Sequence, residues 1–161
     1  MFNQDYSRFP IFMGLDSSQI SQLLPYMVEC RFTRDSVIFE QGASAEYLYI
    51  LLAGEVIVQY KPYDGPSLIV AHVEPGGVFG WSAALGREVY TSGTIAVVDS
   101  LAYRIRGSNL SVICREHPET GRILLERLAS SIAERLRSTH TQILEILSQG
   151  RDAERRSGLN E

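Results

Sequence analysis

The chain has 161 residues, the length of one ordinary domain. Hydrophobic residues make up 45% and charged residues 21%, which allows a full core and excludes wholesale disorder. Fifteen basic against 19 acidic residues leave a net charge of −4. A chain this acidic binds polyanions poorly, which argues against a dedicated DNA- or RNA-binding domain.

The sequence shows no disulfide framework, signal peptide or membrane span. Cys30 and Cys114 are too few for a disulfide framework, and we expect reduced core thiols. Residues 1–16 contain no basic region followed by an apolar run, so no signal peptide is predicted. No stretch approaches the roughly 20 apolar residues of a membrane span. We therefore expect a cytoplasmic protein without membrane contact.

A helix is predicted over residues 16–29. Asp16 is a good N-cap, and Gln19 three residues later completes a capping box. Pro25 is expected to kink this helix or end it early. The apolar face of the helix contains Ile20, Leu23, Leu24 and Met27.

Short β-prone runs separated by glycine turns follow. They occupy residues 36–39, 47–51, 56–58, 68–70, 94–98 and 101–106. In the last run, Leu101, Tyr103 and Ile105 alternate with residues of the opposite face. Many short strands at about ten-residue spacing predict a compact antiparallel sandwich or barrel.

Helical patterns return after Arg106. Ser108 is the expected cap of a short helix, and Pro118 suits the first turn of a long one. We expect this long helix to end at Gly150. The predicted division is a β domain with its N-terminal helix over 1–117, a dimerisation helix over 118–150 and a charged flexible tail over 151–161.

The apolar residues of the long helix fit a heptad repeat. A helix of about 45 Å outreaches so small a domain, which favours a homodimer seam. The alternative is an amphipathic helix that packs on its own domain. One core position holds Leu125, Ile132, Thr139 and Ile146, and the other holds Ala129, Leu136 and Ile143.

Two motifs resemble the cyclic nucleotide-binding domain family. The run Val37–Val56 resembles the first half of its β-roll, and Pro75-Gly76-Gly77-Val78-Phe79-Gly80 resembles the entry to its phosphate-binding cassette. The similarity covers residues 10–147 and is that of the sensor half of catabolite-activator-type regulators. It implies a mainly β fold with flanking helices: an eight-stranded antiparallel β-roll (jelly-roll, double-stranded β-helix), an N-terminal helix and a long C-terminal helix.

The resemblance also implies where a ligand binds. Gly76, Gly77 and Gly80 allow close backbone approach, and the free N–H groups of a short helix after them would face an anion. The implied ligand is a cyclic nucleotide or another small anion. The implied ligand-binding residues are Gly80, Trp81, Ser82, Ala83, Ala84, Arg87, Tyr90, Thr91 and Ser92, and residues 80–92 are called the cassette below.

Two cassette positions depart from the family. Trp81 stands where the family has a glutamate for the ribose hydroxyl, and Tyr90 or Thr91 stands where it has an arginine for the phosphate. Losing two charge-assisted hydrogen bonds of about 1.5–3 kcal/mol each weakens binding by about 10²–10⁴-fold. Arg87 either supplies a cation or is a solvated loop residue, and Trp81 either stacks on a purine or fills the pocket.

No catalytic motif is present, and we expect no enzyme activity. A barrel-bound metal needs several histidines, whereas His72 has only Glu74 on its face, so no metal is expected. Three functions remain open: a dimeric regulatory sensor with a small-molecule effector, a ligand-free dimerisation or protein-interaction module, and the sensor fragment of a longer transcription regulator. The winged helix-turn-helix of such regulators is not recognisable, so this chain alone is not expected to bind DNA.

Overall fold

A computed structural model describes residues 5–158. The described chain contains four α-helices: α1 (Ser17–Leu23), α2 (Trp81–Ala84), α3 (Gly107–Glu116) and α4 (Pro118–Gly158). It also contains three 3₁₀ turns: η1 (Tyr6–Arg8), η2 (Pro10–Phe12) and η3 (Leu24–Tyr26). The strands are β1 (Met27–Phe32), β2 (Val37–Phe39), β3 (Tyr47–Ala53), β4 (Val56–Tyr60), β5 (Leu68–Val73), β6 (Val78–Phe79), β7 (Gly93–Ala96) and β8 (Ser100–Arg106).

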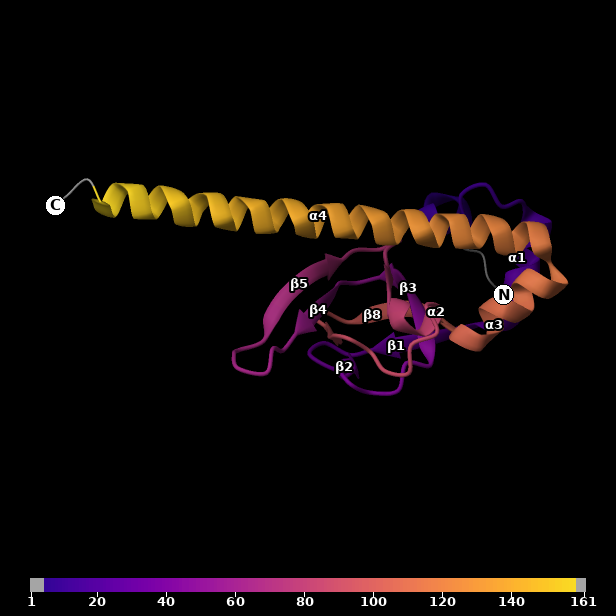
Figure 1. Ribbon diagram of the computed structural model, residues 1–161. Helices are drawn as coiled ribbons and strands as arrows, with labels where there is room; N and C mark the ends of the chain where they lie inside the picture. Colours follow the sequence, from indigo (N-terminus) through magenta and orange to yellow (C-terminus); the bar gives the residue numbers. More distant parts are fainter. Residues whose placement is uncertain (1–4, 159–161) are drawn as a thin grey trace.

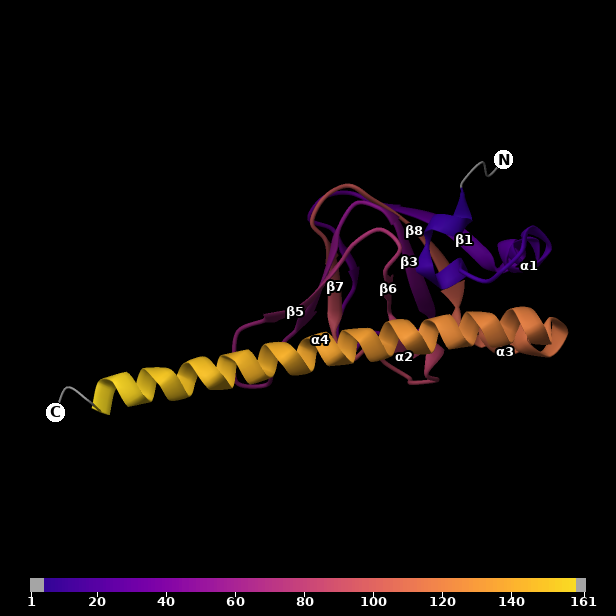
Figure 2. The ribbon, with the colours of Figure 1, turned by 90° about the horizontal axis from the view of Figure 1, so that it is seen from above.

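The strands form two four-stranded antiparallel sheets, which confirms the predicted β-roll. One sheet has the order β1-β8-β3-β6 and the other β2-β7-β4-β5. Both views show α4 as a rod that crosses the roll and continues beyond β5, away from α1 and α3 (Figures 1 and 2). The roll therefore supports only the first part of α4.

Strand β3, in the sheet of β1, β8, β3 and β6, is buried on both faces. Leu48, Ile50 and Leu52 of β3 join a core with the N-terminal turns, α3 and α4. Tyr49 and Leu51 point the other way, into a core shared with the second sheet. Burial on both faces explains why β3 is an unbroken apolar run and does not alternate with polar residues.

The prediction of a helix over residues 16–29 is wrong beyond Leu23. Asp16 and Gln19 do form the expected capping box. Pro25 then lies in the 3₁₀ turn η3, and the chain from Met27 onward is strand β1, paired with β8. The proline removes a backbone donor from a helix that the sequence pattern would otherwise continue.

Two further helix ends differ from the expectation. Arg106, and not Ser108, is the N-cap of α3, and it makes no side-chain capping bond. The prediction that the long helix ends at Gly150 is also wrong, because α4 continues to Gly158. A single exposed glycine costs a helix only about 1 kcal/mol, which the helix formers on either side can offset.

Glycines set the path of the cassette. Gly80 has φ 79°, which turns the chain from β6 into α2. Gly107 opens α3, and a Cβ at this position would lie 2.3 Å from the Ala83 carbonyl oxygen. The end of α2 thus touches the start of α3 without an intervening side chain.

Gly80→Ala is expected to destabilise the protein more than Gly86→Ala. Both glycines have positive φ, so alanine costs about 1–2 kcal/mol of backbone strain at either position. At Gly80 the new Cβ would also lie 2.8 Å from the Tyr47 carbonyl oxygen, whereas at Gly86 nothing lies within 4 Å. Urea unfolding of both variants measures the difference, and equal losses would contradict this account.

Candidate functional site

A cavity of about 500 Å³ lies between the cassette and α4. We call it the cassette cavity. Its apolar wall includes Val58, Val70 and Ala71 of β4 and β5. Of the predicted ligand-binding residues, Gly80, Trp81, Ser82, Arg87, Tyr90, Thr91 and Ser92 line it. Ala83 and Ala84 do not, because they face a smaller hollow beside Gly107.

Tyr90 fixes the far end of the cassette. Its ring stacks on Phe39 at a centroid distance of 3.7 Å. Its hydroxyl donates to the Tyr47 carbonyl at 2.6 Å and accepts from the Tyr47 N–H at 3.1 Å. Burial raises the pKa of Tyr90, so the side chain stays neutral. This position therefore offers a ligand an aromatic surface and no cation.

Trp81 and Arg135 form the contact between the cassette and α4. The Arg135 guanidinium lies 4.1 Å from the centre of the Trp81 ring, within range of a cation–π interaction. Arg135 Nη2 donates to the Val78 carbonyl, which also accepts from the Trp81 ring N–H at 3.2 Å. Burial lowers the pKa of Arg135 to about 10, so the side chain remains charged at neutral pH.

Sequence reasoning missed Arg135. The heptad pattern identified its neighbours Ile132, Leu136 and Thr139 as seam residues, and all three line the cassette cavity together with it. A guanidinium beside an apolar seam is an ordinary feature of a sequence. Only the packing of α4 on the cassette reveals its place, and no signal in the sequence alone would have found it.

The remaining seam residues lie outside the cavity. Leu125, Ala129, Ile143 and Ile146 are exposed in the single chain. Every residue from 140 to 158 is exposed as well, including the apolar Leu144 and Leu147. The first turns of α4 instead bury Leu124 and Leu128 against the chain's own domain. Packing on its own domain therefore holds for the first turns of α4, and the dimer seam stays a prediction for the exposed stretch.

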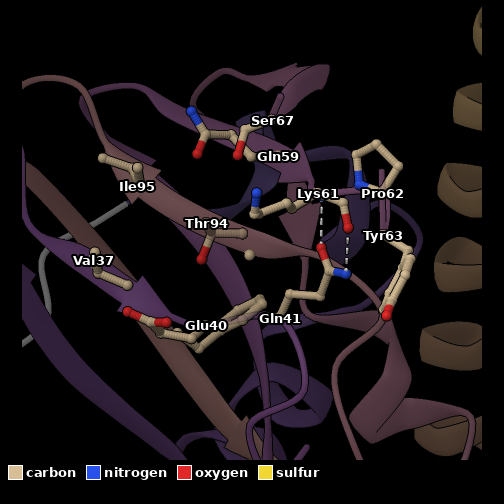
Figure 3. A pocket seen from close by; sticks show the side chains of 12 residues that line it. Val37, Glu40, Gln41, Gln59, Lys61, Pro62, Tyr63, Ser67, Thr94 and Ile95 are labelled. Atoms are coloured by element: carbon tan, nitrogen blue, oxygen red, sulfur yellow. Dashed lines mark hydrogen bonds between the residues drawn. The ribbon is translucent and has the colours of Figure 1, made fainter. Parts of the chain in front are cut away.

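A second hollow, of about 460 Å³, lies between β2, β7 and the β4–β5 hairpin (Figure 3). None of the predicted site residues lines it. The Gln41 side chain forms two hydrogen bonds with the Lys61 backbone at its edge, drawn as dashed lines. Lys61 and Glu40 give this hollow one charge of each sign. It therefore has no net preference for an anion.

His72 pairs with Glu55, at 3.0 Å between Nδ1 and Oε1. The register places His72 of β5 opposite Ile57 of β4. Over residues 5–158, no three His, Cys, Asp or Glu side chains gather as metal ligands would. Nor is any helix in that range long and apolar enough to cross a bilayer.

Comparison with known proteins gives one family match. Residues 29–117 match the model of the cyclic nucleotide-binding domain. The chain is 24% identical over 141 residues to a CRP-like cAMP-activated global transcriptional regulator from Mycobacterium tuberculosis, covering 88% of this chain and 61% of that protein. It thus spans less than two thirds of this curated relative.

Solved structures agree with the fold. The catabolite activator protein of Thermus thermophilus superposes with a TM-score of 0.72 at 25% identity, over 86% of this chain and 63% of that one. A cyclic nucleotide-binding domain from Methylobacillus flagellatus gives a TM-score of 0.77 at 21% identity, over 81% and 74%. The second likeness shows the β-roll fold alone.

Tyr90→Phe is expected to lower the free energy of unfolding by about 1–3 kcal/mol, because the Tyr47 N–H and carbonyl lose their hydroxyl partner. Tyr49→Phe is the matched control. Its ring also stacks, at 5.0 Å from Phe79, but its hydroxyl bonds to none of residues 5–158. We expect a change below about 0.5 kcal/mol there. Chemical denaturation compares the two, and similar losses would rule out the structural role of the Tyr90 hydroxyl.

Proposed function

The chain belongs to the cyclic nucleotide-binding domain family, and from this premise we propose that it is a non-catalytic sensor domain. A small molecule in the cassette cavity changes how α4 packs against the β-roll. One observation carries the proposal: the cavity has the cassette as one wall and the α4 residues Ile132, Leu136 and Thr139 as another. A ligand that contacts both walls favours one position of α4 over others.

The size of the cavity distinguishes this proposal from a ligand-free module. In that alternative, the Trp81 indole fills the space where a ligand would lie. The indole is held at the wall by its bond to Val78 and by Arg135, and about 500 Å³ remains beside it. Ligand sites in proteins are commonly of about 300–1,000 Å³, so the space favours a sensor.

The second element of the proposal is a homodimer through α4. The exposed seam residues Ile143 and Ile146 lie on the part of α4 that no other element within residues 5–158 covers. A coiled coil would bury them against the same face of a second copy. Movement of α4 at the cavity would then change how the two copies meet.

The curated relatives favour a related candidate function. One is named as a global transcriptional regulator and another as a cyclic AMP receptor protein, and this chain matches 61% and 62% of their length. As the sensory part of such a regulator, the domain would pass its signal through α4 to a DNA-binding region. Without that region, the output would be a protein partner that recognises the dimer.

Cyclic AMP and cyclic GMP are expected to bind more weakly than to a domain with both charged cassette side chains. Each missing charge-assisted hydrogen bond costs about 10–10²-fold in affinity. Titration calorimetry measures this, and low-micromolar binding of either nucleotide would contradict it.

Ala71→Phe narrows the cassette cavity and should abolish the binding, whereas Ser67→Phe at the second hollow should not. Equal binding by both variants would place the ligand elsewhere.

Ile143→Glu combined with Ile146→Glu should give monomers, because two carboxylates would be buried in the seam of a dimer. Thr141→Glu is the control, since this exposed position lies off the predicted seam. Light scattering measures the mass of each protein. A double variant that stays dimeric would exclude α4 as the interface, and a monomeric wild type would exclude the homodimer.

A further inference from the structure

The cassette cavity is positively charged, although the chain carries a net charge of −4. Arg87 and Arg135 line it, and no aspartate or glutamate does. The hydroxyl-bearing side chains around it are Ser82, Tyr90, Thr91, Ser92, Thr94 and Thr139. Two cations and several hydroxyl donors with no carboxylate make a wall that favours an anion.

Arg135 is the less satisfied of the two arginines. A guanidinium has five N–H donors, and within residues 5–158 only one hydrogen bond from Arg135 is formed, to the Val78 carbonyl. No carboxylate of those residues lies within 4.0 Å of it. Arg135 is half-buried, and a cation at such a position is stabilised by an anion beside it. Arg135 lines two hollows, the cassette cavity and one of about 590 Å³ that also contains Glu74 and Glu134. Because the carboxylates of the second hollow disfavour an anion there, the partner of Arg135 is expected in the cassette cavity.

Arg87 is different. It is exposed, it follows Gly86 in the loop after α2, and its side chain contacts no hydrogen-bond partner in the described chain. Water satisfies such a side chain at no cost, so its lack of a partner does not indicate a ligand. Arg135, in contrast, is held in one orientation by Trp81 and Val78.

We propose that the cassette cavity binds a small molecule with a compact oxyanion, a phosphate or a carboxylate. Arg135 of α4 forms an ion pair with this oxyanion. This proposal rests on the proposed function, because it takes the cassette cavity as the ligand site. The phosphate-binding arginine that the resemblance places in the cassette is thus replaced from the opposite wall. The Val58, Val70 and Ala71 side of the cavity accommodates the apolar part of the ligand.

Because the cation lies on α4 and not in the cassette, ligand binding is coupled to the position of this helix. A cassette arginine binds an anion without involving the long helix. Arg135 instead lies one residue before the predicted seam residue Leu136, so its ion pair with the ligand acts directly on α4. Binding of the anion would then directly favour one position of α4.

Trp81 provides a built-in reporter, because it is the sole tryptophan of the chain and stacks on Arg135. The wild-type chain is titrated with cyclic AMP, cyclic GMP, inorganic phosphate and acetate at constant ionic strength, with tryptophan emission and calorimetry as readouts. At least one probe should give a saturable change. Comparing the phosphate-containing probes with acetate shows whether the site prefers a phosphate or a carboxylate. Comparing inorganic phosphate with the two nucleotides shows whether binding also needs the rest of the ligand.

Arg135→Gln should weaken the binding of that probe by about 10–100-fold, as expected for loss of a charge-assisted hydrogen bond. Arg137→Gln, which removes an exposed charge two residues away on the same helix, should change it by less than about twofold. Melting curves check that each variant is folded. Arg135→Lys keeps the charge and should bind more tightly than Arg135→Gln, which separates loss of the cation from altered packing.

The outcomes are distinct. If wild type and Arg135→Gln bind a probe equally, the role of Arg135 is overturned while the cavity remains a ligand site. If Arg87→Gln weakens binding and Arg135→Gln does not, the cassette supplies the cation and the proposal is again overturned. If no probe binds the wild-type chain, the anion site itself is rejected. A loss confined to Arg135→Gln supports the proposal.

Discussion

The contact of Arg135 with Trp81 and the Val78 carbonyl is the constraint on which the arrangement of the site depends. It is a polar contact within a cavity whose other α4 residues are Ile132, Leu136 and Thr139. Burial of a cation is costly unless its partners are fixed, so the guanidinium specifies one orientation of the helix. With an apolar side chain at this position, α4 would be held on its own domain by apolar contacts such as those of Leu124 and Leu128.

The far end of the cassette, at Tyr90, is uncharged, in contrast to the end that contacts Arg135. Tyr90 is neutral and buried, stacks on Phe39, and uses its hydroxyl on the backbone of Tyr47. Phe39, Tyr49 and Phe79 continue this aromatic layer into the core between the sheets. One end of the cassette is thereby part of the rigid core, and the other end contacts the helix. A ligand between them acts on the helix more easily than on the core.

Much of the architecture could be predicted from the sequence, because glycine turns and short apolar runs indicate most of the strands locally and the family resemblance implied the β-roll. The strands that were missed, β1 and β6, follow a proline and a glycine pair where local signals conflict. The cassette residues were found through family resemblance, yet Ala83 and Ala84 face away from the cavity. Arg135 could not be predicted, since its role comes from contact between segments more than fifty residues apart. Such long-range packing leaves no periodic pattern in the sequence.

The close approach of Gly107 to the Ala83 carbonyl has a consequence for signalling. With no side chain between them, α2 and the start of α3 lie in direct backbone contact. A displacement of the cassette helix would therefore act on α3, which packs on the base of α4. In the proposed sensor, a shift of the cassette would therefore reach α4 at two points, at its base through α3 and partway along through Arg135.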